Sequence, residues 1–312
     1  MRTFLCASAA VVLTACGGNW STRDLEFVNV LPQRADLQAR LPVVGSTSQP
    51  LEGVLTRKDG LNVGDPSQAY ATTKKAATDF NGLLDQVLSI LDTVRLYPPT
   101  TRSEDGRVWG PYPDAKNVGF EFQVAIRQLD PARFAWSIQA RPRGGALFNV
   151  LTGTFDASTS AREGTGAFVV HVANFKDRLA VDPAMQSLDR IDVGYQTASW
   201  PRRVDMAFTF TPGNTSGLSV IGYTYRYLQD GRGALAYQVR TTSVEATVLS
   251  AVALWNTSGA GRAQAVVAEG TYTGATVSEC WDTATKVVFY AESWPGGQMN
   301  GAVADCATID GL

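Results

Sequence analysis

The side chains that could perform acid–base or nucleophilic chemistry are few in this sequence. His171 is the only histidine, so a catalytic triad would have to be built on it. The Gly-x-Ser-x-Gly pattern of a nucleophile elbow is absent. We therefore interpret His171 as a partly buried strand residue, and we expect its replacement by alanine to leave any activity unchanged.

Carboxylates offer a second route to catalysis, because a glycosidase needs two of them about 5 to 10 Å apart in a cleft. The acids of this chain are scattered over predicted turns and strands, and we interpret them as solvated. An envelope hydrolase acting on glycan or peptidoglycan remains an alternative function. The acids considered are Glu104, Asp105, Glu121, Asp192, Asp205, Glu279 and Asp282.

The sequence predicts no cofactor or metal site. The glycine-rich segments 143–145 and 259–261 fit neither a phosphate-binding loop nor a dinucleotide fingerprint. A single histidine and the absence of a Cys-x-x-Cys pair leave too few close ligands for zinc. We therefore expect a protein that is not an enzyme and that holds no cofactor.

The N-terminus carries the most specific motif. Residues 1–15 combine an early cation, Arg2, with an apolar stretch over 4–12, as in a secretory signal peptide. The segment 13–16, Leu-Thr-Ala-Cys, resembles the lipobox of bacterial lipoproteins. The resemblance implies that Cys16 is lipidated on its thiol and that cleavage occurs before it. An ordinary signal peptide and a buried apolar strand are the alternatives.

Lipidation would hold the mature chain at a membrane. Two or more acyl chains, at about 0.8 kcal/mol per buried methylene, anchor a protein stably. Gly17 stands where an enteric inner-membrane retention signal has Asp, so the resemblance implies the outer membrane. Beyond the leader there is no run of about 18 apolar residues, so no transmembrane helix is expected.

The remaining cysteines predict a disulfide. Cys6 leaves with the leader and Cys16 carries lipid, which leaves Cys280 and Cys306. An even remainder in an oxidising compartment indicates a bridge between them. Closing a loop of this size contributes about 3 kcal/mol in the chain-entropy model. Two free buried thiols are the alternative.

The composition is that of a globular protein. The 312 residues are 45% hydrophobic and 18% charged, which is sufficient for a sizeable core. The formal net charge is -2 and no basic run is longer than a pair, as at 74–75 and 202–203. Nucleic acid is therefore not an expected partner.

A long amphipathic helix is predicted over 66–95. The sequence Asp-Pro-Ser-Gln at 65–68 is typical of a helix start, and the prolines at 98–99 end the element. The apolar side chains recur at intervals of three and four and share one stripe: Phe80, Leu83, Leu84, Val87, Leu88, Leu91 and Val94.

From residue 119 the apolar residues alternate with period two, which predicts antiparallel strands joined by short turns, with a helical or irregular insertion at 175–188. The expected fold class is mainly β: a meander of about 12 strands forming a curved sheet or barrel, with the one long helix packed on it. The expected strands are 119–128, 133–141, 147–156, 166–174, 192–199, 203–211, 218–229, 234–242, 245–255, 263–269, 275–281 and 286–293.

We divide the chain into a signal peptide over 1–15, a lipidated tether over 16–50 and a single β-rich domain over 51–312. Tyr223, Tyr225 and Tyr227 share one face of a predicted strand. They are a candidate surface for carbohydrate or lipid, but cross-strand packing is the favoured interpretation.

The segments 254–263 and 278–282, with Cys306, resemble the C-terminal end of uncharacterised envelope lipoproteins of the myxobacterial type. The resemblance implies no activity. We expect a non-enzymatic outer-membrane lipoprotein with a structural role or an apolar ligand. Its expected partners are the membrane, through the anchor, and an apolar ligand or an envelope protein.

A carrier of lipid or lipoprotein in a barrel-like cavity is an alternative function. An apolar cavity between the predicted helix and the sheet would favour the carrier. A solid core there would favour the scaffold.

Overall fold

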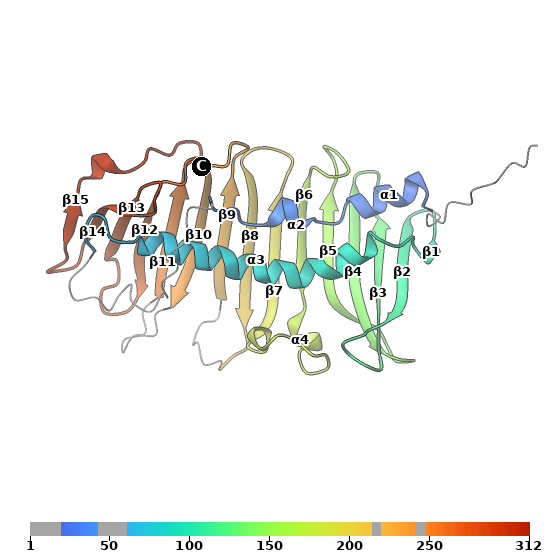
Figure 1. Cartoon of the computed structure of the whole chain (residues 1–312). Helices are drawn as coiled ribbons and strands as arrows, with labels where there is room; N and C mark the ends of the chain where they lie inside the picture. Colours follow the sequence, from blue (N-terminus) through green and yellow to red (C-terminus); the bar gives the residue numbers. More distant parts are fainter. Residues whose placement is uncertain (1–19, 43–60, 214–219, 241–247) are drawn as a thin grey trace, which may run out of the picture.

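The computed structural model describes residues 20–42, 61–213, 220–240 and 248–312. Within them, fifteen antiparallel strands form one sheet in which each strand pairs with its neighbours in the sequence (Figure 1). The strands are β1 Thr101–Arg102, β2 Gly106–Pro113, β3 Phe120–Gln128, β4 Arg133–Pro142, β5 Phe148–Asp156, β6 Thr165–Val170, β7 Leu188–Gln196, β8 Arg202–Phe210, β9 Val220–Tyr227, β10 Gly233–Arg240, β11 Val248–Trp255, β12 Gly261–Glu269, β13 Thr276–Trp281, β14 Val287–Glu292 and β15 Met299–Gly301.

The predicted count of twelve strands was wrong. The twelve predicted strands correspond to β3–β14, and the missed ones lie at the two ends of the sheet. β1 and β15 have two and three residues, too few to show an alternation. β2 contains Pro111 and Pro113, which are unusual inside a strand.

The sheet is open, so the alternative of a closed barrel was also wrong. In the described part of the chain the strand order runs from β1 to β15 without pairing between these two end strands. Both end strands are short, so each leaves only a few backbone groups unpaired, which limits edge-to-edge association.

One long helix and a helical or irregular insertion at 175–188 were predicted, and the described residues contain four α-helices and two short 3₁₀ helices, of which α4 and η1 lie at the insertion. Their bounds are α1 Thr22–Asn29, α2 Arg34–Leu37, α3 Gln68–Val94, α4 Val172–Phe175, η1 Pro183–Met185 and η2 Val303–Asp305. The additional helices have eight residues or fewer, too short for a helical period to stand out in the sequence.

Helix α3 crosses the strands on one face of the sheet, and α1 and α2 lie on the same side (Figure 1). We call this the covered face and the opposite side the open face. Phe80, Leu84, Leu88 and Leu91 of α3 are each 1% exposed or less. Burying a side chain of this size contributes about 1.5–3 kcal/mol, so the interface between α3 and the sheet is the main core.

The described part of the predicted tether also belongs to this core. Phe27, Leu31 and Leu37 are buried. The amide of Arg40 donates a hydrogen bond to the hydroxyl of Tyr225 on β9 at 2.9 Å. Residues 20–42 are therefore packed on the domain.

A buried ion pair fixes α1 to the edge of the sheet. Asp24 is fully buried and accepts hydrogen bonds from Arg107 of β2 at 2.5 Å and from Arg102 of β1 at 3.1 Å. Burial opposes its ionisation, but the hydrogen bonds from Ser21, Arg107 and Arg102 prevail and lower the pKa of Asp24 to about 2. The carboxylate also caps the helix through the amide of Ser21.

Aromatic rings on the covered face lie across glycines of the neighbouring strand. A Cβ added at Gly153 would come within 2.4 Å of the indole of Trp136, its cross-strand partner. The same arrangement joins Gly166 to Tyr195, Gly233 to Trp255 and Gly261 to Trp281. These glycines make room for large rings beneath the helices, because any side chain there would overlap a ring.

The hairpin turns along one edge of the sheet repeat a common pattern. An Asp or Asn opens each turn, and its side chain accepts a hydrogen bond from a turn amide two residues on. Asp130 and Asp156 are 26 residues apart, as are Asp230, Asn256 and Asp282 in succession. The sheet is thus largely a row of similar hairpins, an architecture that presents an extended surface.

Candidate binding face

The open face contains two adjoining shallow hollows. One, of about 580 Å³, crosses β6–β11, and the other, of about 540 Å³, crosses β3–β6. They share Ala167, Phe168 and Val169. Together they extend over nine strands, about 40 Å at 4.8 Å per strand, and we call them the trough.

Two neighbouring rows of mostly small or polar side chains form the floor of the trough. Strand register places the members of each row opposite one another. One row is Ala135, Thr154, Ala167, Gly194, Asp205, Thr224, Ala236 and Val252, and the other is Ala125, Ser137, Thr152, Val169, Asp192, Ala207 and Gly222.

Two glycines of the floor differ from those of the covered face. A Cβ added at Gly194 or Gly222 would meet no atom within 4 Å. Glycine inside a strand costs about 0.5–1 kcal/mol relative to alanine, and packing does not require it here. Such a glycine often marks a place where a ligand or another backbone approaches closely.

Arginines beside the trough hold its carboxylates. Arg190 pairs with Asp192 at 2.6 Å, and Arg203 pairs with Asp205 at 2.6 Å. Asp205 also accepts a hydrogen bond from the hydroxyl of Thr224 at 2.7 Å. These half-exposed carboxylates are therefore neutralised by partners on their own strands.

The open face carries an excess of positive charge. Its described strand side chains include seven arginines and five carboxylates, whereas the whole chain has a net charge of -2. Arg226 lies directly opposite Arg203, and in the described part of the chain neither Arg226 nor Arg262 pairs with a carboxylate. The charged residues are Arg127, Arg133, Arg141, Arg190, Arg203, Arg226 and Arg262, with Glu121, Asp156, Asp192, Asp205 and Glu269.

His171 lies at the end of β6, next to the trough. Its Nε2 is 2.8 Å from the hydroxyl oxygen of Thr152. Burial and the nearby Arg190 guanidinium lower the pKa of His171 below its ordinary value, so the ring is neutral near pH 7. Within the described residues no carboxylate is hydrogen-bonded to the ring, so the groups of a triad are not assembled around it.

The structure gives the other candidate acids separate structural partners. Asp105 binds Arg127 at 3.0 Å, and Glu121 binds Arg141 at 3.0 Å. Asp282 caps a hairpin turn through the amides of Ala284 and Lys286. Glu104 is exposed. None of these contacts brings two acids together.

Glu279 differs from the other candidate acids because its side chain is buried. It is 4% exposed, on the covered face of β13, and accepts hydrogen bonds from the hydroxyl of Ser67 and, at 3.2 Å, from the amide of Ala69. Burial raises the pKa of Glu279 to about 7, although the hydrogen bonds from Ser67, Ala69 and Gln68 favour the ionised form. The carboxyl group anchors the start of α3 and is closed off from solvent.

The tyrosines named as a candidate ligand surface, for which cross-strand packing was the favoured interpretation, lie on the covered face. Tyr225 is fully buried and Tyr227 is 7% exposed, and Tyr223 packs on Phe80 of α3 with ring centroids 6.3 Å apart. The hydroxyl of Tyr227 donates to the carbonyl of Asp36 at 3.2 Å. Side chains buried in this way are not available to a ligand, and their contacts are those of cross-strand and helix–sheet packing.

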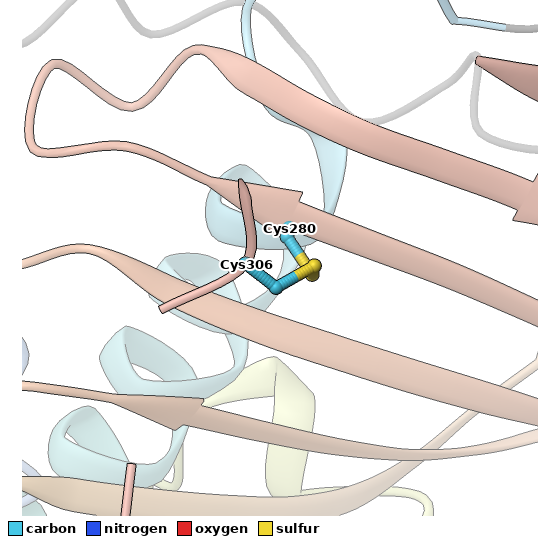
Figure 2. The surroundings of a disulfide bond; sticks show 2 residues. All are labelled: Cys280 and Cys306. Atoms are coloured by element: carbon cyan, nitrogen blue, oxygen red, sulfur yellow. A yellow bond between two sulfur atoms is a disulfide. The ribbon is translucent and has the colours of Figure 1, made fainter. Parts of the chain in front are cut away.

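Cys280 and Cys306 form a disulfide, with a Cα–Cα distance of 5.4 Å. Figure 2 shows the bond joining β13 to the C-terminal tail, with the coils of a helix behind the strands. The carbonyl of Asp310 accepts a hydrogen bond from Arg232, in the turn between β9 and β10, at 2.7 Å. The tail is therefore fixed at two points. Cys16, the predicted lipidation site, lies outside the described residues.

Sequence reasoning missed the trough as a site. The relevant signal is a second alternation: between the large apolar residues of β6–β10 stand Ala167, Gly194, Ala207, Gly222 and Ala236. Small residues on the outward side of five consecutive strands predict a recessed surface. The aromatic residues of the same strands, Tyr223, Tyr225 and Tyr227 among them, lie on the opposite face.

Comparison with known proteins returned no match: no family model, curated protein or solved structure is similar to this chain. In the described residues no helix is long and apolar enough to cross a membrane. The same residues contain no group of three His, Cys, Asp or Glu side chains placed to hold a metal ion.

Proposed function

We propose that this protein is a non-enzymatic lipoprotein anchored to the bacterial outer membrane through Cys16, and that its sheet is a scaffold whose open face binds a partner in the cell envelope. The observation that carries this proposal is the difference between the two faces. The covered face is filled by helices and rings, and the open face is recessed along about 40 Å.

The position of the anchor supports a role close to the membrane. Only residues 17–19 separate Cys16 from Trp20, the first described residue, which precedes α1. Three or four residues span at most about 14 Å when extended. Lipidation of Cys16 would therefore place the β1–β3 end of the sheet next to the bilayer.

The alternative of a lipid carrier has less support. A carrier needs an apolar cavity enclosed by the helix and the sheet, whereas the hollows described above lie on the side away from α3. Phe80, Leu84 and Leu88 fill the space beneath the helix.

The alternative of a hydrolase also has less support. Glu279 is the one described carboxylate whose pKa is raised to about 7, and it is sealed beneath the start of α3. Asp192 and Asp205 are exposed enough to meet a substrate, but each is held by an arginine.

The anchor is tested by palmitate labelling of the wild type and of Cys16→Ser in the native host. We expect label in the wild type and none in the variant, which should be released into the soluble fraction. A wild-type protein found unlabelled in the cytosol with its leader uncut would contradict the proposal.

Partner binding is tested by native mass spectrometry of the protein released gently from membranes. We expect a bound mass in addition to the lipidated chain. Turnover of a glycan or peptidoglycan by the purified protein, abolished by His171→Ala or by Asp192→Asn, would instead establish the hydrolase.

A further inference from the structure

We infer that the trough binds a linear acidic polysaccharide, with the sugar chain running across the strands and its carboxylates on the arginines beside the trough. This inference rests on the proposed function, since it names the partner of the open face. The first argument is shape: the trough is long, shallow and open at its surface, which suits a narrow extended chain rather than a compact ligand.

The floor permits close approach to the backbone. Gly194 and Gly222 leave empty space above their Cα atoms, and Ala167 and Ala207 each add a single methyl group. A polymer lying there could reach the polar side chains that line the trough. These are Ser137, Asn149, Thr152, Thr154, Thr224, Gln238 and Ser250.

The charge pattern indicates an acidic occupant. Arg203 and Arg226 stand directly opposite each other on β8 and β9, two residues from the floor positions Asp205 and Thr224. Like charges in such a pair destabilise a sheet unless an anion bridges them. Arg203 forms an ion pair with Asp205. Arg226 pairs with no carboxylate in the described part of the chain, so its guanidinium is available to a ligand.

Other partners fit the same surface less well. A single-stranded nucleic acid needs exposed aromatic rings for base stacking, whereas Trp136, Phe168 and Tyr237 of these strands are buried on the covered face. A flat anionic membrane would meet the strands beside the trough but would not follow the recessed floor along its length. A second copy would bring two arginine-rich faces together.

The test measures binding of the full mature chain to alginate oligosaccharides by isothermal titration calorimetry. The comparison probes are neutral dextran, poly-glutamate and vesicles of phosphatidylglycerol and phosphatidylcholine. One variant fills the trough, Gly194→Tyr with Gly222→Tyr, and another removes the free cations, Arg226→Gln with Arg262→Gln. The control, Lys74→Gln with Lys116→Gln, removes the same charge from exposed positions on α3 and on the β2–β3 turn.

We expect the wild type and the lysine control to bind alginate with equal affinity and not to bind dextran. Each trough variant should bind at least about tenfold more weakly, the effect of losing one charged hydrogen bond. Thermal denaturation should show that both trough variants remain folded, because both glycine positions face open space and neither arginine is buried. Raising the salt concentration should weaken wild-type binding.

Absence of alginate binding, or binding that the trough-filling variant leaves unchanged, would overturn the inference. The inference would also be overturned if poly-glutamate or the vesicles bound more strongly than alginate and the filling variant abolished that binding. That result would still leave the open face as the binding surface of the proposed function. If native mass spectrometry shows a partner whose binding the filling variant does not alter, the proposed function itself fails.

Discussion

Glycines have opposite surroundings on the two faces of this sheet. On the covered face, Gly153 and Gly233 lie beneath the indoles of Trp136 and Trp255, so a methyl group there would overlap a ring. On the open face, Gly194 has no neighbour within 4 Å of an added Cβ. The first kind of glycine is explained by packing within the chain. The second kind costs stability without improving the packing, and the proposed partner of the open face would account for it.

Charged groups show the same contrast. Asp24, on the buried side of α1, is fully buried and pairs with Arg107 and Arg102. Asp192, on the open face, has a comparable contact with Arg190, but both side chains are about half exposed. An ion pair sealed from water and one in contact with water should therefore respond very differently to removal of one partner.

The largest expected effect concerns these two ion pairs. Asp24→Ala leaves the buried Arg107 without its carboxylate and should lower the free energy of unfolding by about 4 kcal/mol. Asp192→Ala leaves Arg190 in water and should lower it by less than about 1 kcal/mol. Urea denaturation of the two variants measures both values, and equal losses would contradict the distinction between the faces.

The second prediction concerns pH. Glu279 has its pKa raised to about 7 by burial, from an ordinary value of 4.5, so folding favours its protonated form. Its stabilising contribution is complete below pH 4.5 and is lost as the pH rises to about 7. The loss should reach about 3 kcal/mol. Glu279→Gln keeps a neutral side chain and should abolish this part of the pH dependence.

The measurement is the free energy of unfolding of wild type and Glu279→Gln across this pH range. The difference between the two should change steadily with pH. A constant difference for Glu279→Gln would show that the carboxyl group is ionised beneath α3.

The smallest expected effect concerns the glycines. Gly153→Ala forces a methyl group into the indole of Trp136 and should cost about 2 kcal/mol. Gly194→Ala fills empty space on a strand and should stabilise the protein by about 0.5 kcal/mol. Thermal denaturation should show a lower melting temperature for Gly153→Ala and a higher one for Gly194→Ala. Destabilisation by Gly194→Ala would mean that this glycine serves the fold after all.

Much of the sheet could be predicted because alternation is a local signal. The strands β3–β14 each contain enough residues to show period two, and Cys280 with Cys306 follows from counting cysteines. The edge strands could not be predicted, since two or three residues carry no period. Whether a long meander closes depends on the geometry of its ends, which the alternation does not encode.

The candidate site shows a different limit. Alternation places Tyr223, Tyr225 and Tyr227 on one face, but it does not say which face the helices cover. That choice is made by contacts far apart in the sequence, such as Phe80 against Tyr223 and Arg40 against Tyr225. Because α3 covers the tyrosines, the small residues of the same strands form the exposed surface. The candidate site is therefore the trough and not the tyrosines.

The central claim is that the open face is occupied in the envelope and free in the isolated protein. Ala167→Cys places a thiol where the two hollows meet, and Thr78→Cys places one on the exposed side of α3. The measurement is the rate of maleimide labelling of each thiol in intact envelopes and in purified protein. We predict that the envelope slows labelling of Ala167→Cys and leaves Thr78→Cys unchanged. Equal labelling of Ala167→Cys in both preparations would contradict the claim.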